Sequence, residues 1–238
     1  MAFNKNITFK GTSSTAYPLI ITTPPQIAHP EVINEEWQIP GRDGVLFGAD
    51  PYLANGVITV NMALVAQSGF TNNVSKYQIA YRQVRQWLQG TGKLILGDSP
   101  DSYFEVLKVA ITTDDRQILR YGQLQVQFTV YPYEFLSSGD TGVSAGTLNN
   151  TGDEASPLYK ISGTGSGTLT VHGNTMTYEV SGDLYIDTRR FIAYDALGAN
   201  KNSKISGDYE SIRLIHGNNV VSASVGTLTI YPKWGYKL

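Results

Sequence analysis

The side chains that could do chemistry are few in this sequence and lie far apart. Histidine occurs three times, at His29, His172 and His216, and no two are spaced to bind a metal from one element. His172 and His216 each precede a glycine in a predicted hairpin turn, where a histidine is usually exposed and has no catalytic role. The absence of cysteine excludes a disulfide framework, a thiolate metal site and a cysteine nucleophile.

The carboxylates and the glycine-rich segment give no catalytic pattern either. Asp98 with Asp101, and Asp114 with Asp115, lie in predicted turns, whereas general acid–base catalysis needs one carboxyl group in a desolvated setting. Residues 163–167 lack the Gly-Lys-Ser/Thr ending of a phosphate loop and are not followed by a helix, as a nucleophile elbow would be. The sequence therefore predicts no catalytic residue, no metal site and no cofactor site, so we expect that the protein is not an enzyme.

Composition indicates a folded protein rich in strands and turns. The chain has 238 residues, of which 41% are hydrophobic, 24 are glycine, 10 are proline and 15 are tyrosine. This length is sufficient for two domains, each with its own core. Charged residues make up 16%, below the roughly 25% of an ordinary domain. Such a low charge content suits a subunit with much of its surface in contacts, and it equally suits many β-sandwiches.

Charge and hydropathy exclude two further classes of protein. The net charge is −2 and no run of Lys or Arg exists, which argues against binding of nucleic acid through its phosphates. A protein that only lets DNA slide through a pore would not need such a patch. The first residues resemble no signal peptide, and no apolar run approaches the roughly 18 residues of a membrane helix. We therefore expect synthesis in the cytoplasm and no membrane insertion.

In the first half the periodicity predicts strands around a single helix. Tyr77, Tyr81, Val84 and Leu88 recur at helical spacing within residues 73–89, with Asn72 or Asn73 available as the cap. In residues 123–131 apolar side chains alternate with Gln and Thr, which predicts a half-buried strand with an uncharged polar face. Further strands are expected at residues 56–64, 93–97 and 103–111. Turns are expected at residues 40–44, 98–101 and 112–116, the first with positive φ at its glycines and Asp43 capping the bend.

The second half is predicted to contain only strands and turns. Residues 137–156 are polar and small, which is typical of a linker into a second domain, with room for an extended strand within it. The domains are therefore expected at residues 1–138 and 139–238. Short strands separated by Gly and Asn turns indicate a β-sandwich. Strands are expected at residues 168–171, 176–180, 184–187, 191–194, 212–215, 220–225 and 226–232, with turns at 181–183 and 216–219.

Several short motifs, in order along nearly the whole chain, resemble the distal tail protein (Dit) family of siphophage tail tips and baseplates. The most telling are the Ile-Pro-Gly-Arg-Asp-Gly segment at residues 39–44 and the closing strand at residues 228–234. Between them lie Trp87-Leu88, Lys93-Leu94 with Asp98, residues 128–132, residues 149–152 with Pro157, residues 161–165, Ile186-Asp187, Gly207-Asp208 and residues 216–219.

The resemblance implies a mainly β fold: an α+β first domain with one helix, followed by a galectin-like β-sandwich. It also implies a structural hub in the virion, assembled in the host cytoplasm. Six copies would form a ring through the first domain, connect the tail tube protein to a tail-associated hub protein or receptor-binding proteins, and leave a channel for DNA. Some members of the family carry an inserted carbohydrate-binding module, for which the second half of this chain has no room.

Two other classes of protein stay open at this stage. A carbohydrate-binding β-sandwich that contacts a host cell-wall saccharide would need exposed aromatic side chains, for which the candidates are Tyr185, Tyr194, Tyr209 and Trp234. A β-sandwich glycosidase would need two carboxylates that face each other across a cleft, and no such pair is evident.

Overall fold

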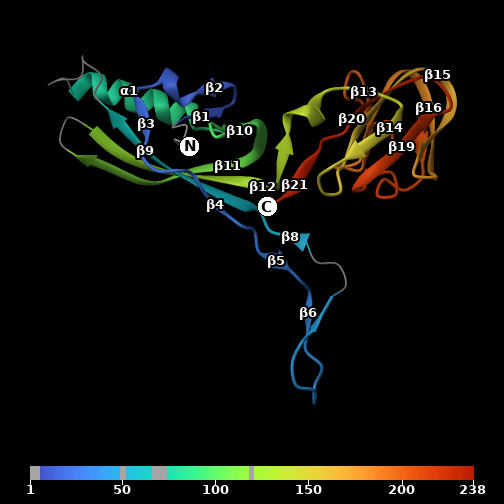
Figure 1. The fold of residues 1–238 in the computed structure, drawn as a ribbon, viewed down its shortest axis with the longest axis horizontal. Helices are drawn as coiled ribbons and strands as arrows, with labels where there is room; N and C mark the ends of the chain where they lie inside the picture. Colours follow the sequence, from blue (N-terminus) through green and yellow to red (C-terminus); the bar gives the residue numbers. More distant parts are fainter. Residues whose placement is uncertain (1–5, 49–51, 66–73, 118–120) are drawn as a thin grey trace. The chain divides into compact units, whose positions relative to one another are not determined.

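A computed structural model describes residues 6–48, 52–65, 74–117 and 121–238 of the chain (Figure 1). The contacts divide the chain into two compact units, one formed by Met1–Glu134 with Leu238 and the other by Phe135–Lys237. The described residues contain many strands and a single α-helix, which lies in unit 1. The prediction of a mainly β fold with one helix in the first half is confirmed.

Unit 1 is built on one antiparallel sheet whose strand order is β2-β1-β10-β11-β12-β9-β3. Strand β4 also pairs with β9, on the same edge as β3 but at residues 57–59, whereas β3 pairs at residues 62–64. The expected strand at residues 56–64 is part of β9, which pairs with β12 over its whole length. Leu124, Val126, Phe128 and Val130 are buried as the alternation predicted. The strands are β1 (Ile7–Phe9), β2 (Thr12–Ser13), β3 (Leu19–Ile21), β4 (Gln26–Ala28), β9 (Gly56–Val65), β10 (Gly92–Leu96), β11 (Ser99–Gln117) and β12 (Tyr121–Leu136).

Helix α1 (Val74–Trp87) covers the apolar face of this sheet (Figure 1). Tyr81, Val84 and Leu88 are buried in the core with the strands, so the predicted stripe is confirmed. The indole Nε1 of Trp87 donates to the carbonyl of Phe9 at 3.1 Å, and the two rings meet edge to face at 6.4 Å. The proposed caps Asn72 and Asn73 lie outside the described residues.

Between β4 and β9 the chain forms a narrow ribbon, called the arm here: residues 29–48 and 52–55. Strand β5 (Val32–Ile33) pairs with β8 (Tyr52–Leu53), and β6 (Glu36–Trp37) pairs with β7 (Leu46–Phe47). The tip is the predicted turn: Gly41 and Gly44 have φ of +81° and +84°, and the N–H of Arg42 donates to the carbonyl of Ile39. The expected cap from the Asp43 carboxylate is not seen among the described contacts.

Unit 2 folds eight strands over a second core. The order is β13-β20-β15-β16-β17, while β19 pairs with both β14 and β15, and β18 pairs with β16. The hairpin of β15 and β16 keeps one register from Leu158 opposite Asp187 to Val171 opposite Asn174. The strands are β13 (Val143–Ser144), β14 (Gly146–Asn150), β15 (Leu158–Val171), β16 (Asn174–Asp187), β17 (Ile192–Asp195), β18 (Ile205–Ser206), β19 (Gly217–Ala223) and β20 (Thr227–Tyr231). A short 3-10 helix, η3 (Asn202–Lys204), precedes β18, and β21 (Gly235–Lys237) follows β20.

The segment predicted as a linker is part of unit 2. Residues 137–156 contain the 3-10 helix η2 (Ser137–Asp140), β13 and β14. The N–H of Leu136 donates to the carbonyl of Trp234 at 2.8 Å, and the N–H of Lys233 donates to that of Gly139 at 2.9 Å. These residues are ordered by backbone pairing and not by the burial of apolar side chains.

Five other local predictions were wrong in whole or in part. Residues 181–183, predicted as a turn, lie inside β16, where Gly182 pairs with Gly163 of β15 across the hairpin. Two further predicted turns, at residues 98–101 and 112–116, fall largely within β11, which runs from Ser99 to Gln117. Residues 212–215 form a turn with one isolated bridge from Leu214 to Ala155, and β19 begins at Gly217 inside the predicted turn.

Candidate interaction surfaces

The structure keeps the sequence's titratable candidates apart. His216 Nδ1 lies 2.9 Å from the carbonyl of Gly152, His172 is in the β15–β16 turn, and His29 is exposed in the arm. Asp98 and Asp101 are exposed, and the side chains of Asp114 and Asp115 lie outside the described part. In the described ranges no group of three or more His, Asp or Glu side chains is arranged to hold a metal ion. Among those same residues, no helix has the length and apolarity needed to cross a membrane.

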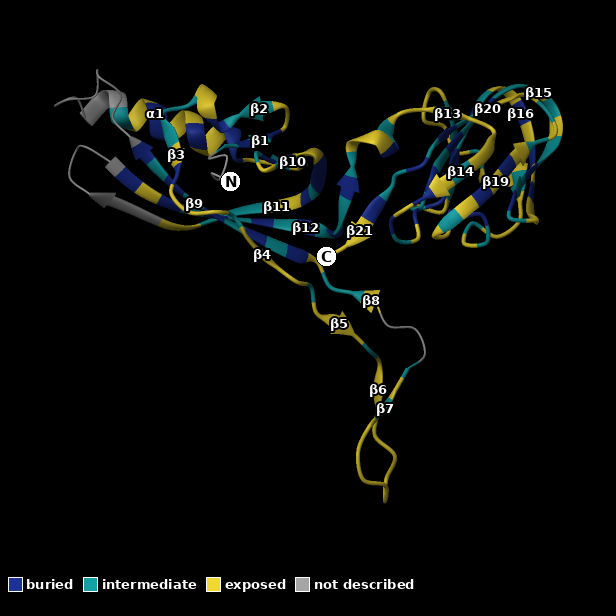
Figure 2. Ribbon diagram, in the orientation of Figure 1, coloured by how far each residue is buried: buried dark blue, intermediate teal, exposed yellow. Residues whose placement is uncertain are grey.

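Exposed apolar side chains are concentrated in the arm. In Figure 2 most of the arm's ribbon has the colour of exposed residues. Trp37, Phe47 and Tyr52 are 57%, 61% and 59% exposed, and Val32, Ile33, Ile39 and Val45 add aliphatic surface. Isolated apolar residues on a surface need no explanation, but a contiguous group on one ribbon marks an interaction site.

A second surface is the polar face of the unit 1 sheet, where four side chains form a hydrogen-bonded ladder. Thr112 Oγ1 donates to Gln125 Oε1 at 2.9 Å, and Gln125 Nε2 donates to Asn61 Oδ1 at 3.1 Å. Asn61 Nδ2 in turn donates to Thr23 Oγ1 at 3.0 Å. The ladder crosses β11, β12 and β9 and ends just beyond β3. None of the four residues is charged, so this part of the face can be desolvated at lower cost than an ionic one.

The aromatic candidates for sugar stacking are not free on the outer face of unit 2. Tyr185 and Tyr194 stack on each other with centroids 5.3 Å apart and planes inclined by 6°. The ammonium group of Lys160 lies 5.6 Å from the Tyr185 centroid. Trp234 is half-buried against the core, and Tyr209 contacts Phe191 edge to face at 6.0 Å. These rings serve packing, which disfavours them as the platform that a carbohydrate-binding protein needs.

On the outer face of unit 2, ionic contacts hold two carboxylates in place, those of Asp183 and Asp195. Lys160 Nζ lies 3.0 Å from Asp183 Oδ2, and Ser162 Oγ donates to Asp183 Oδ1 at 2.6 Å. Hydrogen bonds from Ser162 and Lys160 hold the pKa of the Asp183 carboxyl below its usual range. At the end of β17, the backbone N–H groups of Ala199 and Leu197 and the ammonium of Lys201 lower the pKa of Asp195.

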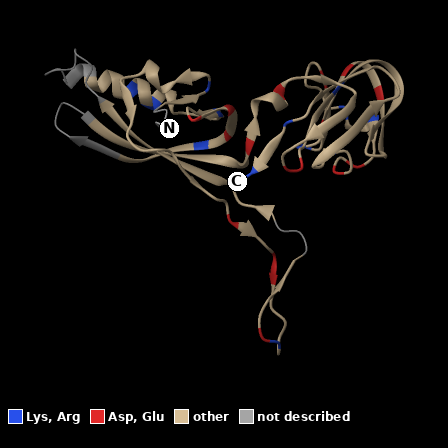
Figure 3. Ribbon diagram, in the orientation of Figure 1, with Lys and Arg blue, Asp and Glu red and all other residues tan. Residues whose placement is uncertain are grey.

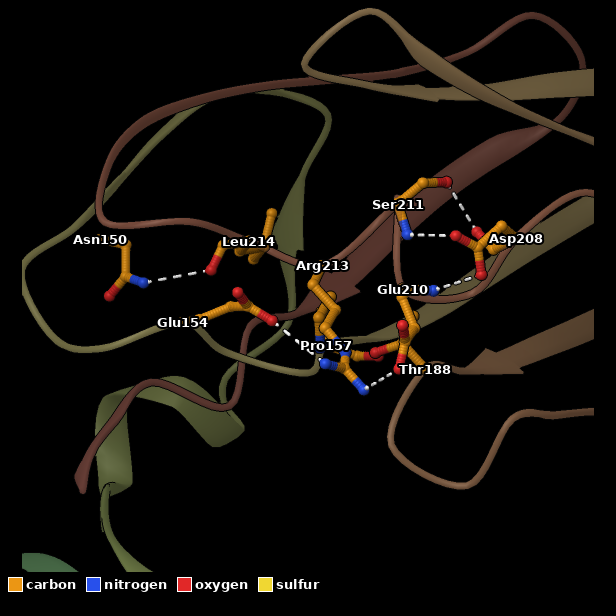
Figure 4. Close-up of polar contacts among 9 residues, drawn as sticks. All are labelled: Asn150, Glu154, Pro157, Thr188, Asp208, Glu210, Ser211, Arg213 and Leu214. Atoms are coloured by element: carbon orange, nitrogen blue, oxygen red, sulfur yellow. Dashed lines mark hydrogen bonds and ion pairs between the residues drawn. The ribbon is translucent and has the colours of Figure 1, made fainter. Parts of the chain in front are cut away.

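A polar cluster holds the segment that was predicted as a strand at residues 212–215 (Figure 4). Arg213 lies between two carboxylates, with Nη1 3.2 Å from Glu154 and Nη2 3.4 Å from Glu210. Asp208 accepts hydrogen bonds from the N–H groups of Glu210 and Ser211. Side chains thus take the place of strand pairing here, and the cluster is structural in character.

The described residues also include a groove of about 500 Å³ in unit 2. It lies over the outer side of the β15–β16 hairpin, between the β19–β20 turn and the η3–β18 segment. Its lining comes from four separate segments: residues 166–168, 177–179, 203–206 and Ser224. Because these segments are far apart in sequence, no linear motif could have revealed the groove.

Figure 3 shows Lys and Arg residues at separate places along the described chain in each unit. The arm and the helix differ in the sign of their charge. The described arm carries the acids Glu31, Glu35, Glu36 and Asp43 against Arg42 alone, whereas the described side chains of α1 include Arg82 and Arg85 and no acid.

No protein-family model matches the sequence, and no curated protein matches it at the level of sequence. Among solved structures, the chain resembles the Dit protein (gp 19.1) of phage SPP1, described as a paradigm of the hub adsorption apparatus in phages that infect Gram-positive bacteria. The alignment covers 100% of both chains with 13% identity and a TM-score of 0.72. A chain of the phage P2 baseplate, in its activated conformation with Ca, aligns at 11% identity and a TM-score of 0.46, covering 100% of this chain and 99% of that one. The protein described here therefore has, along its whole length, the fold of a phage Dit protein.

Proposed function

We propose that this protein is a structural hub of a phage tail tip or baseplate. The observation that carries the proposal is the match of both units, in one alignment, to a protein described as part of a hub adsorption apparatus. Fold alone does not imply function, so the proposal also draws on the surfaces suited to assembly. It draws as well on the finding that no group of three or more His, Asp or Glu side chains in the described residues is arranged to hold a metal ion. In this role the protein has no enzymatic activity and needs no cofactor or metal.

The assembly that we propose is a closed ring, most simply of six copies, formed through unit 1. The arm and the uncharged sheet face are different surfaces, so a contact between one of each is heterologous, and a heterologous contact closes into a ring when its rotation allows. The arm's exposed aromatic side chains suit such a contact because they would lose water on binding a neighbouring copy. A low charge content of 16% reduces the cost of burying these surfaces.

The proposed partners follow from this ring. One face of the ring would bind the tail tube protein, and the other would bind the tail-associated hub protein or the receptor-binding proteins. The centre would leave a channel through which DNA passes without sequence-specific binding, in keeping with the dispersed cations. The two proposed domains, residues 1–138 and a galectin-like sandwich at residues 139–238, would form the ring and a peripheral module of the virion, which is assembled in the host cytoplasm.

The native mass tests the ring. One chain has a mass of 26.0 kDa, and six chains have 6 × 26.0 = 156 kDa, which light scattering separates easily. We expect a ring-sized particle by light scattering and an annulus in negative-stain images, either alone or after mixing with tail tube and hub proteins. A chain that stays monomeric in all of these mixtures would contradict the proposal.

A further inference from the structure

The groove over the β15–β16 hairpin is concave because segments on both sides of the hairpin form walls beside it. On the hairpin, Ser166 is paired with Glu179 and Thr168 with Thr177, and these four side chains form the floor. Ser224 forms one wall, where its Oγ accepts from the N–H of Thr168 at 2.8 Å. Residues 203–206 form the opposite wall, where β18 pairs with β16.

The groove presents hydroxyl groups that have no partner within the protein. The side chains of Ser166, Thr168, Ser203 and Ser206 make no hydrogen bond to other residues in the described part of the chain. Thr177 Oγ1 is already used, since it donates to the carbonyl of Ser206 at 3.2 Å. In the absence of a ligand, these hydroxyl groups can bond only to water. A ligand with several hydroxyls could therefore donate hydrogen bonds to them and accept hydrogen bonds from them.

The charge of the groove is balanced. Lys204 Nζ lies 2.7 Å from Glu179 Oε2, and no other lining residue is charged. Both side chains are about half exposed, so their outer atoms stay available: the carboxylate can accept from two hydroxyls and the ammonium can donate to an oxygen. Without an excess positive charge the groove offers no preference for a phosphate or carboxylate polymer.

From these features we infer that the groove is a binding site for one or two units of a neutral saccharide. Its volume of about 500 Å³ falls within the range of small-ligand sites, roughly 300–1,000 Å³. Ile205 supplies the one aliphatic contact in the lining, and the single aromatic residue there, Tyr178, is buried. With no exposed aromatic platform, the affinity is expected to be low, with a Kd on the order of 1 mM. This site is separate from the stacked pair Tyr185–Tyr194, and it does not depend on the proposed ring.

Saturation-transfer NMR on the full chain tests the inference, because it detects weakly bound ligands of a protein of 26.0 kDa or larger. The probes are galactose, glucose and N-acetylglucosamine, with glycerol 3-phosphate as the anionic comparison. We expect a saturable signal from at least one neutral sugar and a weaker one from glycerol phosphate. No saturable signal from any neutral sugar, or stronger binding of the phosphate, overturns the inference.

Three variants locate the signal. Glu179→Gln removes the charge-assisted acceptor and is expected to weaken binding about tenfold. Ser166→Phe fills the floor from an exposed position and is expected to abolish binding. Lys201→Gln is the matched control, since Lys201 pairs with Asp195 at 3.4 Å outside the groove. Thermal unfolding verifies that each variant is folded, and a signal that survives both groove variants places the sugar elsewhere and refutes the site.

Discussion

Gln125 and Asn61 join two strands of unit 1 through their side chains, with Nε2 of Gln125 3.1 Å from Oδ1 of Asn61. The residues are directly opposite in the β9–β12 register, so the contact reinforces the backbone ladder beneath it. Because Gln125 also accepts from Thr112, one side chain links three strands.

Gln125→Ala removes both contacts at once. We expect unit 1 to lose about 0.5–1.5 kcal/mol of unfolding free energy, since the partners are partly exposed and water replaces the lost bonds in part. Urea unfolding measures the loss, and Gln123→Ala, on the same face without such contacts, is the control. A loss no larger than that of the control would mean that the ladder does not contribute to stability.

Replacing Trp37 and Phe47 by serine is expected to weaken assembly without weakening the fold. Both side chains are exposed in the single chain, so the unfolding free energy should change by no more than about 0.5 kcal/mol. Light scattering should show loss of the ring-sized particle. Val220→Ser removes a side chain that is 60% exposed in unit 2 and should leave the particle intact. A ring that forms equally well without both aromatics would exclude the arm from the interface.

Gly167→Ala should destabilise unit 2 by about 1–3 kcal/mol through overpacking. A Cβ at this position would lie 2.6 Å from the hydroxyl of Tyr178 and 2.9 Å from Cβ of Val225. In a double-mutant cycle, Tyr178→Phe should relieve part of the cost by removing the hydroxyl, so the double variant should be more stable than the sum of the single effects. If the effects of the two single substitutions on thermal unfolding are strictly additive, the Tyr178 hydroxyl is not the source of the crowding.

Acid should weaken unit 2 through Asp183 and Asp195. Their pKa values are lowered in the folded state, Asp183 by hydrogen bonds from Ser162 and Lys160 and Asp195 chiefly by the N–H of Ala199. The stability that they contribute is present above the unfolded carboxyl pKa of about 3.9 and is lost as pH falls through the folded values. Asp183→Asn should therefore lower Tm at pH 7 and have less effect at pH 2.5. Parallel Tm curves for the variant and the original chain would contradict this account.

Limited proteolysis compares the arm with the segment at residues 137–156. In the isolated chain, thermolysin should cut first near Val45 and Phe47, which are exposed in the arm, and later in the segment held by β13 and β14. Mass spectrometry of early fragments identifies the order. A first cut between residues 137 and 156 would restore the interpretation of that segment as a linker, and protection of the arm in the assembled particle would support its place in the interface.

Local periodicity was enough to predict the elements that have one apolar face and one polar face. The stripe of Tyr81, Val84 and Leu88 defines α1, and the alternation from Leu124 to Val130 defines β12, because both patterns match a single apolar face. The positive φ of Gly41 and Gly44 likewise follows from the turn chemistry of the segment itself.

Prediction failed where tertiary pairing overrides composition. Gly163 and Gly182 resemble turn residues, yet each is a strand residue because the other lies opposite it. Ile212 and Leu214 resemble strand residues, yet Asp208 and Arg213 hold their backbone in a turn. The groove was beyond sequence reasoning for the same reason: its hydroxyl groups become neighbours only when four segments fold together.

The pairing of β16 has one further consequence. On the edge of β16 that does not pair with β15, β18 pairs with residues 177–178 and β17 with residues 184–187. Within the described parts of the chain, no strand pairs with residues 179–183 on that edge. An unpaired strand edge allows another chain to add a strand, which can lead to aggregation at high protein concentration. Glu179 and Asp183 stand at the two ends of the stretch, and Gly182 bends it with a φ of +94°. Carboxylates and a backbone bend thus give this edge its own protection against aggregation.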